Sequence, residues 1–230
     1  MKNHGTKPLC FCALMAVVCL LAGACATYQA RDAKTTGFLG DYSQMKEGKD
    51  GQALLVYKDA AADIKSYTRI LMDPVKLYAS QDHSMSNVAA DDRKKLLNYA
   101  DAAIREQLAK DYVFVREPGP GVMRLRMAIT EAEDANVTMD TISTVLPIGL
   151  AVAALQTVAT GTTSFVGSAG VEAELQDSQT GKRLLAAVDR RIGGKITGKF
   201  DKFDEWRTVK EAIDYWAQRL QTRLTELRAQ

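Results

Sequence analysis

The stretch "VMRLRMAIT", residues 122–130, decides the fold of this chain. Apolar side chains occupy every second position: Met123, Leu125, Met127 and Ile129. Arg124, Arg126 and Thr130 lie between them, and this alternation is typical of a strand with one buried face and one solvated face. We therefore expect a sheet whose apolar face is covered by another layer.

The next ordered stretches extend this sheet. "VEAELQ", residues 171–176, alternates in the same way through Val171, Ala173 and Leu175. "DSQTGK", residues 177–182, has the composition of a turn, and "RLLAAVDRRI", residues 183–192, is expected to return as an antiparallel partner.

Shorter strands are predicted upstream. "YTRILMDPVKLYA", residues 67–79, is rich in apolar and β-branched residues, and Pro74 indicates a bulge or an edge within it. "YVFV", residues 112–115, and "ALLVY", residues 53–57, are two further short strands.

Two helices are predicted, over residues 91–110 and 204–228. The second carries a continuous apolar stripe: Phe203, Trp206, Val209, Ile213, Trp216, Leu220, Leu224 and Leu227. A helix lying on the sheet accounts for this stripe, and a partner-binding coiled coil is the alternative. The order β-α-β-β-insert-β-β-α predicts a single α+β domain over residues 66–230, a mostly antiparallel sheet with helices on one face.

The insert is the most unusual segment, since residues 142–160 are almost wholly apolar. Val145–Ala159 has only Gln156 and Thr157 as polar interruptions, and its fifteen residues are short for a membrane span. It is a buried or sheet-covering helix, or else a membrane-seeking or self-associating segment that would form an interaction surface.

The N-terminus has the layout of a secretory signal. Two lysines precede the apolar run Leu9–Ala22, which ends in the small residues Gly23 and Ala24. We expect residues 1–24 to be removed, either as an ordinary signal peptide or at a bacterial lipobox. In the second case Cys25 becomes the diacylated N-terminus, which explains a cysteine directly behind the junction. Residues 25–36 would then be a polar tether, and residues 37–65 an ordered extension.

Composition excludes several classes of function. Removing Lys2 and Lys7 from the 30 basic residues leaves 28, equal to the 28 acidic residues, so no nucleic-acid partner is indicated. All four cysteines lie at or before residue 25, and His83 is the one histidine that remains after processing. Cysteine-based and multi-histidine zinc sites are therefore excluded, and we expect no metal and no cofactor.

Three patterns resemble catalytic or binding motifs without completing them. "GGKITGKF", residues 193–200, has phenylalanine where a phosphate loop has serine or threonine, and it follows a hairpin strand. His83 has no nucleophile elbow beside it. The carboxylates Glu131, Glu133 and Asp134 follow the expected end of a strand. A solvated loop is a simpler interpretation of them than a hydrolase site.

Four motifs together resemble the bacterial lipoprotein family named domain of unknown function thirty-three-thirteen. They are Gly37–Ser43 (GFLGDYS), Asp73–Val75 (DPV), Pro118–Gly121 (PGPG) and Val188–Arg191 (VDRR). The family has no established activity, so the resemblance implies no catalytic residue. The element order is more distantly similar to the curli-secretion lipoprotein, an oligomeric outer-membrane pore, and to the N-terminal domain of the Tol translocation protein.

We therefore expect a non-enzymatic lipoprotein of the cell envelope, anchored in the outer membrane through Cys25 and facing the periplasm. Ala26 supports an outer-membrane location, because aspartate, the residue that usually retains a lipoprotein in the inner membrane, is absent at this position. A binding or assembly role is expected, with a protein partner or self-association through residues 142–160. The alternatives are a subunit of an oligomeric pore or secretion channel and, third, a hydrolase.

Overall fold

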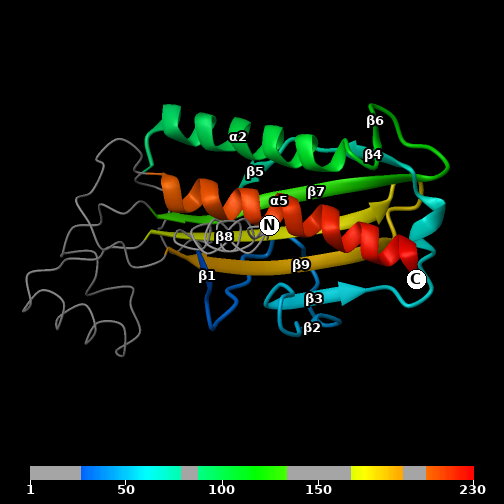
Figure 1. The fold of residues 1–230 in the computed structure, drawn as a ribbon, viewed down its shortest axis with the longest axis horizontal. Helices are drawn as coiled ribbons and strands as arrows, with labels where there is room; N and C mark the ends of the chain where they lie inside the picture. The colour runs from blue at the N-terminus through cyan, green and yellow to red at the C-terminus, as the bar shows by residue number, and fades with distance from the viewer. Residues whose placement is uncertain (1–26, 79–87, 134–166, 194–205) are drawn as a thin grey trace, which may run out of the picture.

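In the computed structural model, residues 27–78, 88–133, 167–193 and 206–230 are described. They form one α+β domain, a nine-stranded sheet with two long helices along one face (Figure 1). The predicted fold class and its mostly antiparallel sheet are confirmed. Seven strands run in the order β2-β3-β9-β8-β7-β4-β6, β1 pairs with β9, and β5 pairs with β7.

Three long antiparallel strands form the centre of the sheet: β7 (Val122–Glu133), β8 (Ser168–Asp177) and β9 (Arg183–Ile192). Leu125 lies opposite Leu175, and Leu175 opposite Leu185. The four alternating residues of β7 predicted to face the core are all buried. The hairpin expected from "DSQTGK" joins β8 to β9.

The strands at the edges are short. On one side lie β3 (Leu55–Lys58), β2 (Lys46–Glu47) and β1 (Tyr28–Gln29). On the other lie β4 (Arg69–Met72), β5 (Lys76–Leu77) and β6 (Val113–Val115), and these pair in parallel. Pro74 lies in the break between β4 and β5, because proline has no N–H to give to a ladder.

The two predicted helices are present, α2 as Ala90–Leu108 and α5 as Arg207–Ala229, and a single 3-10 turn, η1 (Ile64–Ser66), precedes β4. The helices pack against each other and against the sheet. Most of the predicted α5 stripe is buried: Val209, Ile213, Trp216, Leu224 and Leu227. This face of the sheet holds the main apolar core.

The opposite face of the sheet differs from the expected solvated one. Residues 27–45, which we call the strap, begin as β1 in the sheet, and the residues after β1 cover part of this face. Phe38 and Leu39 of the strap form a second apolar cluster with Ala128, Ala186 and Val188 of β7 and β9. The prediction of a wet face is therefore wrong over this area, because the N-terminal part of the chain folds back onto it.

Candidate functional site

Several predicted site residues lie outside the described residues: Cys25, His83, Asp134, the apolar segment 142–160, and the Gly/Lys stretch after Gly193. Glu131 and Glu133 belong to β7, so their placement in a solvated loop is wrong. Glu131 is buried and accepts a hydrogen bond from Ser168 Oγ. Arg190 Nε lies within 2.8–2.9 Å of both carboxylate oxygens of Glu131. This carboxylate fastens β7 to β8 and β9, and its oxygens are taken up by those contacts.

The chain enters the fold at Thr27, two residues after Cys25. Arg191 at the end of β9 donates from Nε to Thr27 Oγ1 at 2.7 Å and from Nη2 to the Thr27 carbonyl. Its guanidinium also lies 3.7 Å from the centre of the Tyr215 ring on α5, a cation–π contact. Next, Tyr28 pairs with Ile192, and the Ala30 N–H donates to the Arg190 carbonyl at 2.8 Å. The first described residues are therefore fixed to the sheet.

Asp189 joins the strap to the helix layer. Its carboxylate accepts hydrogen bonds from Gln29 Nε2 at 2.8 Å, from the Leu54 N–H at 3.3 Å and from Trp216 Nε1 at 2.8 Å. Its side chain is buried, and a buried carboxylate without such donors would be strongly destabilising. One acidic group on β9 thus fixes β1, the start of β3 and the middle of α5.

A second buried carboxylate, Glu172 of β8, holds the bend of the strap. It accepts hydrogen bonds from the Thr36 N–H at 2.6 Å, the Thr36 hydroxyl at 2.9 Å, the Leu39 N–H at 3.3 Å and the Tyr42 hydroxyl. Burial and the hydrogen bond to Glu172 raise the pKa of Tyr42 to about 12. Gly37, at φ 97°, allows the left-handed turn that brings these donors together.

Glu174 of β8, on the same face of the sheet as Glu172, pairs with two arginines. It contacts Arg126 of β7 and accepts from Arg183 Nε of β9 at 2.8 Å. Arg183 then donates from its two other nitrogens to the carbonyls of Leu39 and Asp41, each at 2.6 Å. Arg126 lies over the Phe38 ring at 5.2 Å. The strap is therefore held by charged groups that are themselves paired across three strands.

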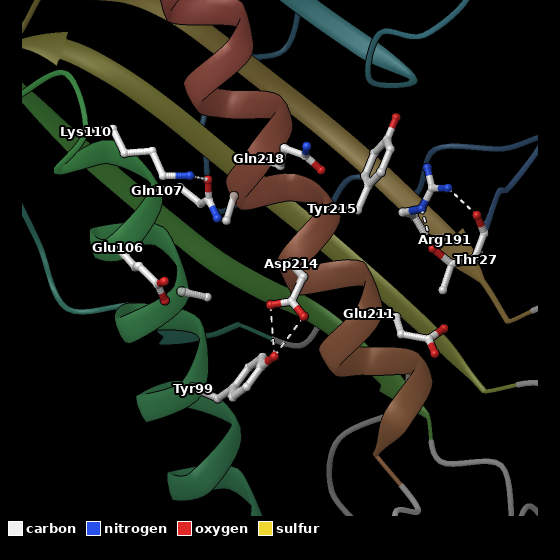
Figure 2. Close-up of a pocket in the computed structure, with 12 residues that line it drawn as sticks. Thr27, Tyr99, Glu106, Gln107, Lys110, Arg191, Glu211, Asp214, Tyr215 and Gln218 are labelled. Carbon is white, nitrogen blue, oxygen red and sulfur yellow. Dashed lines mark hydrogen bonds between the residues drawn. The ribbon is translucent and has the colours of Figure 1, made fainter. Parts of the chain in front are cut away.

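A groove of about 760 Å³ lies between α2 and α5 on the other side of the sheet (Figure 2). Its wall on the α2 side carries Tyr99, Glu106 and Gln107 of the helix and Lys110 just after it, and its wall on α5 carries Glu211, Asp214, Tyr215 and Gln218. The Tyr99 hydroxyl lies 2.8–2.9 Å from both Asp214 oxygens. Thr27 and Arg191 line the groove as well, so it reaches the point where the chain enters the fold. Its charged lining suits polar contacts and not an acyl chain.

Within the described ranges, no three His, Cys, Asp or Glu side chains are grouped closely enough to hold a metal ion. In the same part of the chain, no helix combines the length and the apolar character needed to cross a bilayer. The buried carboxylates are engaged by arginine, tyrosine and backbone donors. The arrangement is chemically suited to holding polypeptide in place.

Comparison with known proteins identifies the family. The model for a protein of unknown function, DUF3313, matches residues 34–220. The chain belongs to the DUF3313 family. This DUF3313 protein is also similar to the uncharacterized lipoprotein YdcL of Escherichia coli K12, with 27% identity over 210 residues and 90% of each chain covered.

Solved structures resemble this DUF3313 protein weakly. A PelC dodecamer from Paraburkholderia phytofirmans is 14% identical with a TM-score of 0.39, over 72% of this chain and 94% of that one. A DUF330 protein from Xanthomonas campestris is 10% identical with a TM-score of 0.40, over 71% and 86% of the two chains.

The four motifs that carry the family resemblance have visible structural roles in this DUF3313 protein. GFLGDYS is the part of the strap that Glu172 and Arg183 hold. VDRR lies in β9 and supplies Asp189, Arg190 and Arg191. DPV supplies Asp73, whose carboxylate accepts from Arg124 at 2.8–2.9 Å, and PGPG ends in Gly121, at φ 67°, just before β7. Two of the four motifs therefore fasten the strap.

Sequence patterns missed Glu172 and Glu174, the two carboxylates at the centre of this arrangement. They occupy the positions of "VEAELQ" that alternation assigns to solvent. The available signal was the excess of arginines on neighbouring strands, Arg126 and Arg183, together with an upstream motif rich in glycine and polar groups.

Proposed function

We propose that this DUF3313 protein is a lipid-anchored component of the bacterial cell envelope. Residues 1–24 are removed as a signal, and Cys25 carries the diacylglycerol. The observation that carries the proposal is the cysteine directly behind a cleavable junction, in a chain that matches a protein named as a lipoprotein over 90% of its length. Two or more acyl chains give stable attachment, since each buried methylene contributes about 0.8 kcal/mol.

The anchor is proposed to lie in the outer membrane, with the domain in the periplasm. Ala26 supports this choice, because a retained inner-membrane lipoprotein usually has aspartate at that position. Sucrose-gradient separation of the two membranes tests it. Wild type should co-sediment with outer-membrane markers, and Ala26→Asp should shift the protein to the inner membrane. Wild type in the inner-membrane fraction would contradict the proposal.

The molecular role is proposed to be non-enzymatic binding or assembly. In support, the buried carboxylates Glu131, Glu174 and Asp189 are each engaged by cationic or hydrogen-bonding partners, and the chain after residue 25 contains no cysteine. Self-association or a protein partner is proposed at the apolar segment 142–160. Crosslinking and size-exclusion chromatography in detergent test this, and a strict monomer with no crosslinked partner in cells would contradict it.

The decisive experiment is membrane fractionation and intact-mass measurement of wild type against Cys25→Ser. Wild type should be membrane-bound, with the mass of residues 25–230 plus lipid. Cys25→Ser should lose the lipid mass and the membrane association that depends on it. Cys19→Ser is the matched control, since this cysteine leaves with the signal, and it should behave as wild type. An unmodified wild-type protein in the soluble fraction would overturn the proposal.

A further inference from the structure

The way the strap begins constrains how the anchored domain meets the membrane. Thr27 is fixed to Arg191, and Tyr28–Gln29 pair with the last residues of β9. Only Ala26 separates Thr27 from Cys25, so the Cα atoms of these two residues lie at most about 7 Å apart even in a fully extended chain. If Cys25 is lipidated, as proposed above, this is too short for a flexible tether. The end of the domain at Thr27 must then lie beside the lipid headgroups.

The sheet register identifies that end. One row of paired residues crosses four strands: Tyr28 of β1 faces Ile192 of β9, Ile192 faces Ser168 of β8, and Ser168 faces Glu133 of β7. The start of α5 lies at the same end, since a Cβ on Gly193 would come within 2.7 Å of Thr208 Oγ1. In Figure 1 this is the left end, where β7 and β9 finish and β8 and α5 begin.

Tyr28 itself has the properties of an interfacial side chain. It is 65% exposed, and with the exposed Gln29 it lies between the buried residues Thr27 and Ala30. Tyrosine is favoured at membrane interfaces because its ring is apolar and its hydroxyl stays hydrated. A large exposed aromatic group three residues after the lipidated position is well placed to enter the headgroup layer.

We propose that the bilayer surface is the partner of this end of the domain, with the row Tyr28–Ile192–Ser168–Glu133 facing the headgroups and Tyr28 in contact with them. The long strands then rise away from the membrane. The twelve residues of β7 place its first residue, Val122, about 36 Å from Glu133. The α2–α5 groove has its Thr27 and Arg191 end beside the bilayer.

The chain offers a matched pair of probe positions. Val113 of β6 is 64% exposed, almost the same as Tyr28, but its partner Arg69 is also paired with Val122, at the opposite end of β7. No cysteine follows residue 25, and acylation blocks the Cys25 sulfur. Tyr28→Cys and Val113→Cys in the full lipidated chain therefore each present one labelling site.

Both variants are labelled with an environment-sensitive fluorophore and reconstituted into phosphatidylethanolamine–phosphatidylglycerol vesicles that contain lipid with a spin-labelled headgroup. We expect quenching at position 28 to exceed quenching at 113 by about twofold or more, given the expected separation from the bilayer. Equal quenching, or stronger quenching at 113, in protein that floats with the vesicles overturns this inference alone. Protein that does not float lacks the lipid anchor, and then the proposed function falls together with the inference.

A lengthened tether tests the physical cause. About 20 Gly and Ser residues inserted between Ala26 and Thr27 give a coil with an average span of about 25 Å. In this background the difference between positions 28 and 113 should fall sharply, while flotation is unchanged. A difference that persisted in full would contradict the role given to the short connection.

Discussion

On one face of the sheet, α2 and α5 cover apolar side chains such as Leu125, Leu175 and Ile129. On the other, the strap covers a face where Glu131, Glu172 and Glu174 are paired with arginines and backbone amides. Apolar burial is non-directional and stabilises the whole domain. Hydrogen bonds to a buried carboxylate require specific atoms at specific distances. The helix face therefore supplies stability, and the strap face holds residues 36–42 in a defined position on the sheet.

We expect substitutions on the two faces to differ both in how much stability they remove and in which part of the domain they open. Loss of apolar volume on the helix face should lower the global free energy of unfolding. Loss of one acceptor on the strap face should open the strap while the helices stay folded, because local openings follow local contacts.

The largest effect is expected for Leu224→Ala on α5, whose side chain is fully buried. Removing it leaves a cavity and should lower the free energy of unfolding by about 3 kcal/mol. Urea unfolding followed by tryptophan fluorescence measures this. Leu220→Ala, one turn earlier and only partly buried, is the matched control and should cost less than half as much. Equal losses would contradict the assignment of Leu224 to the core.

Glu172→Gln should cost about 2 kcal/mol, because an amide cannot accept all the hydrogen bonds that the buried carboxylate accepts. Hydrogen exchange locates the effect: the amides of Thr36 and Leu39 should exchange much faster, while those in the middle of α5 stay protected. Glu47→Gln, at an exposed position of β2, is the control and should leave the exchange unchanged. Uniformly faster exchange throughout the chain would show that the strap is not a separate layer.

The difference between the faces also explains what the sequence could reveal. Periodicity locates β7, β8, β9 and both helices because each buries one apolar stripe against the other layer. The same rule assigns Glu172, Glu174 and Arg126 to solvent, since alternation cannot distinguish a wet face from one covered by a distant segment. Only the fold brings residues 36–42 onto β8. The parallel pairing of β4 is likewise set by tertiary contacts, because the short run Arg69–Met72 carries no signal of strand direction.

A third change tests the link between the two layers. Trp216→Phe keeps the ring in the helix-face core but removes the Nε1–H that Asp189 accepts at 2.8 Å. We expect a loss of about 1.5 kcal/mol, since the buried carboxylate keeps its bonds to Gln29 and the Leu54 amide. Trp206→Phe, at the partly buried residue just before α5, is the control. A double-mutant cycle with Gln29→Ala should show coupling, and strictly additive losses would mean that Asp189 does not connect the layers.

The smallest expected effect is a loss of folding stability at high pH. The pKa of Tyr42 is raised to about 12 by burial and by its hydrogen bond to Glu172. The neutral hydroxyl is therefore favoured in the folded state. The stability that this hydrogen-bonded hydroxyl contributes is fully present below about pH 10, the usual pKa of tyrosine in an unfolded chain. It is lost as the pH rises from about 10 to 12. Because Tyr42 is only partly buried, solvent screening reduces the expected contribution to about 1 kcal/mol.

Urea midpoints measured between pH 9 and pH 12 should therefore fall less steeply in Tyr42→Phe than in wild type. Tyr67 provides a comparison away from the strap, since burial and its hydrogen bond to Asp177 raise its pKa to about 12 as well. Tyr67→Phe should also flatten the profile, but hydrogen exchange at pH 8 should show a looser strap only in Tyr42→Phe, which loses the bonds to Gly37, Leu39 and Glu172. If both variants loosen the strap equally, Tyr42 does not fasten it through Glu172. In that case the apolar contacts of Phe38 and Leu39 would be sufficient to hold the chain on the sheet.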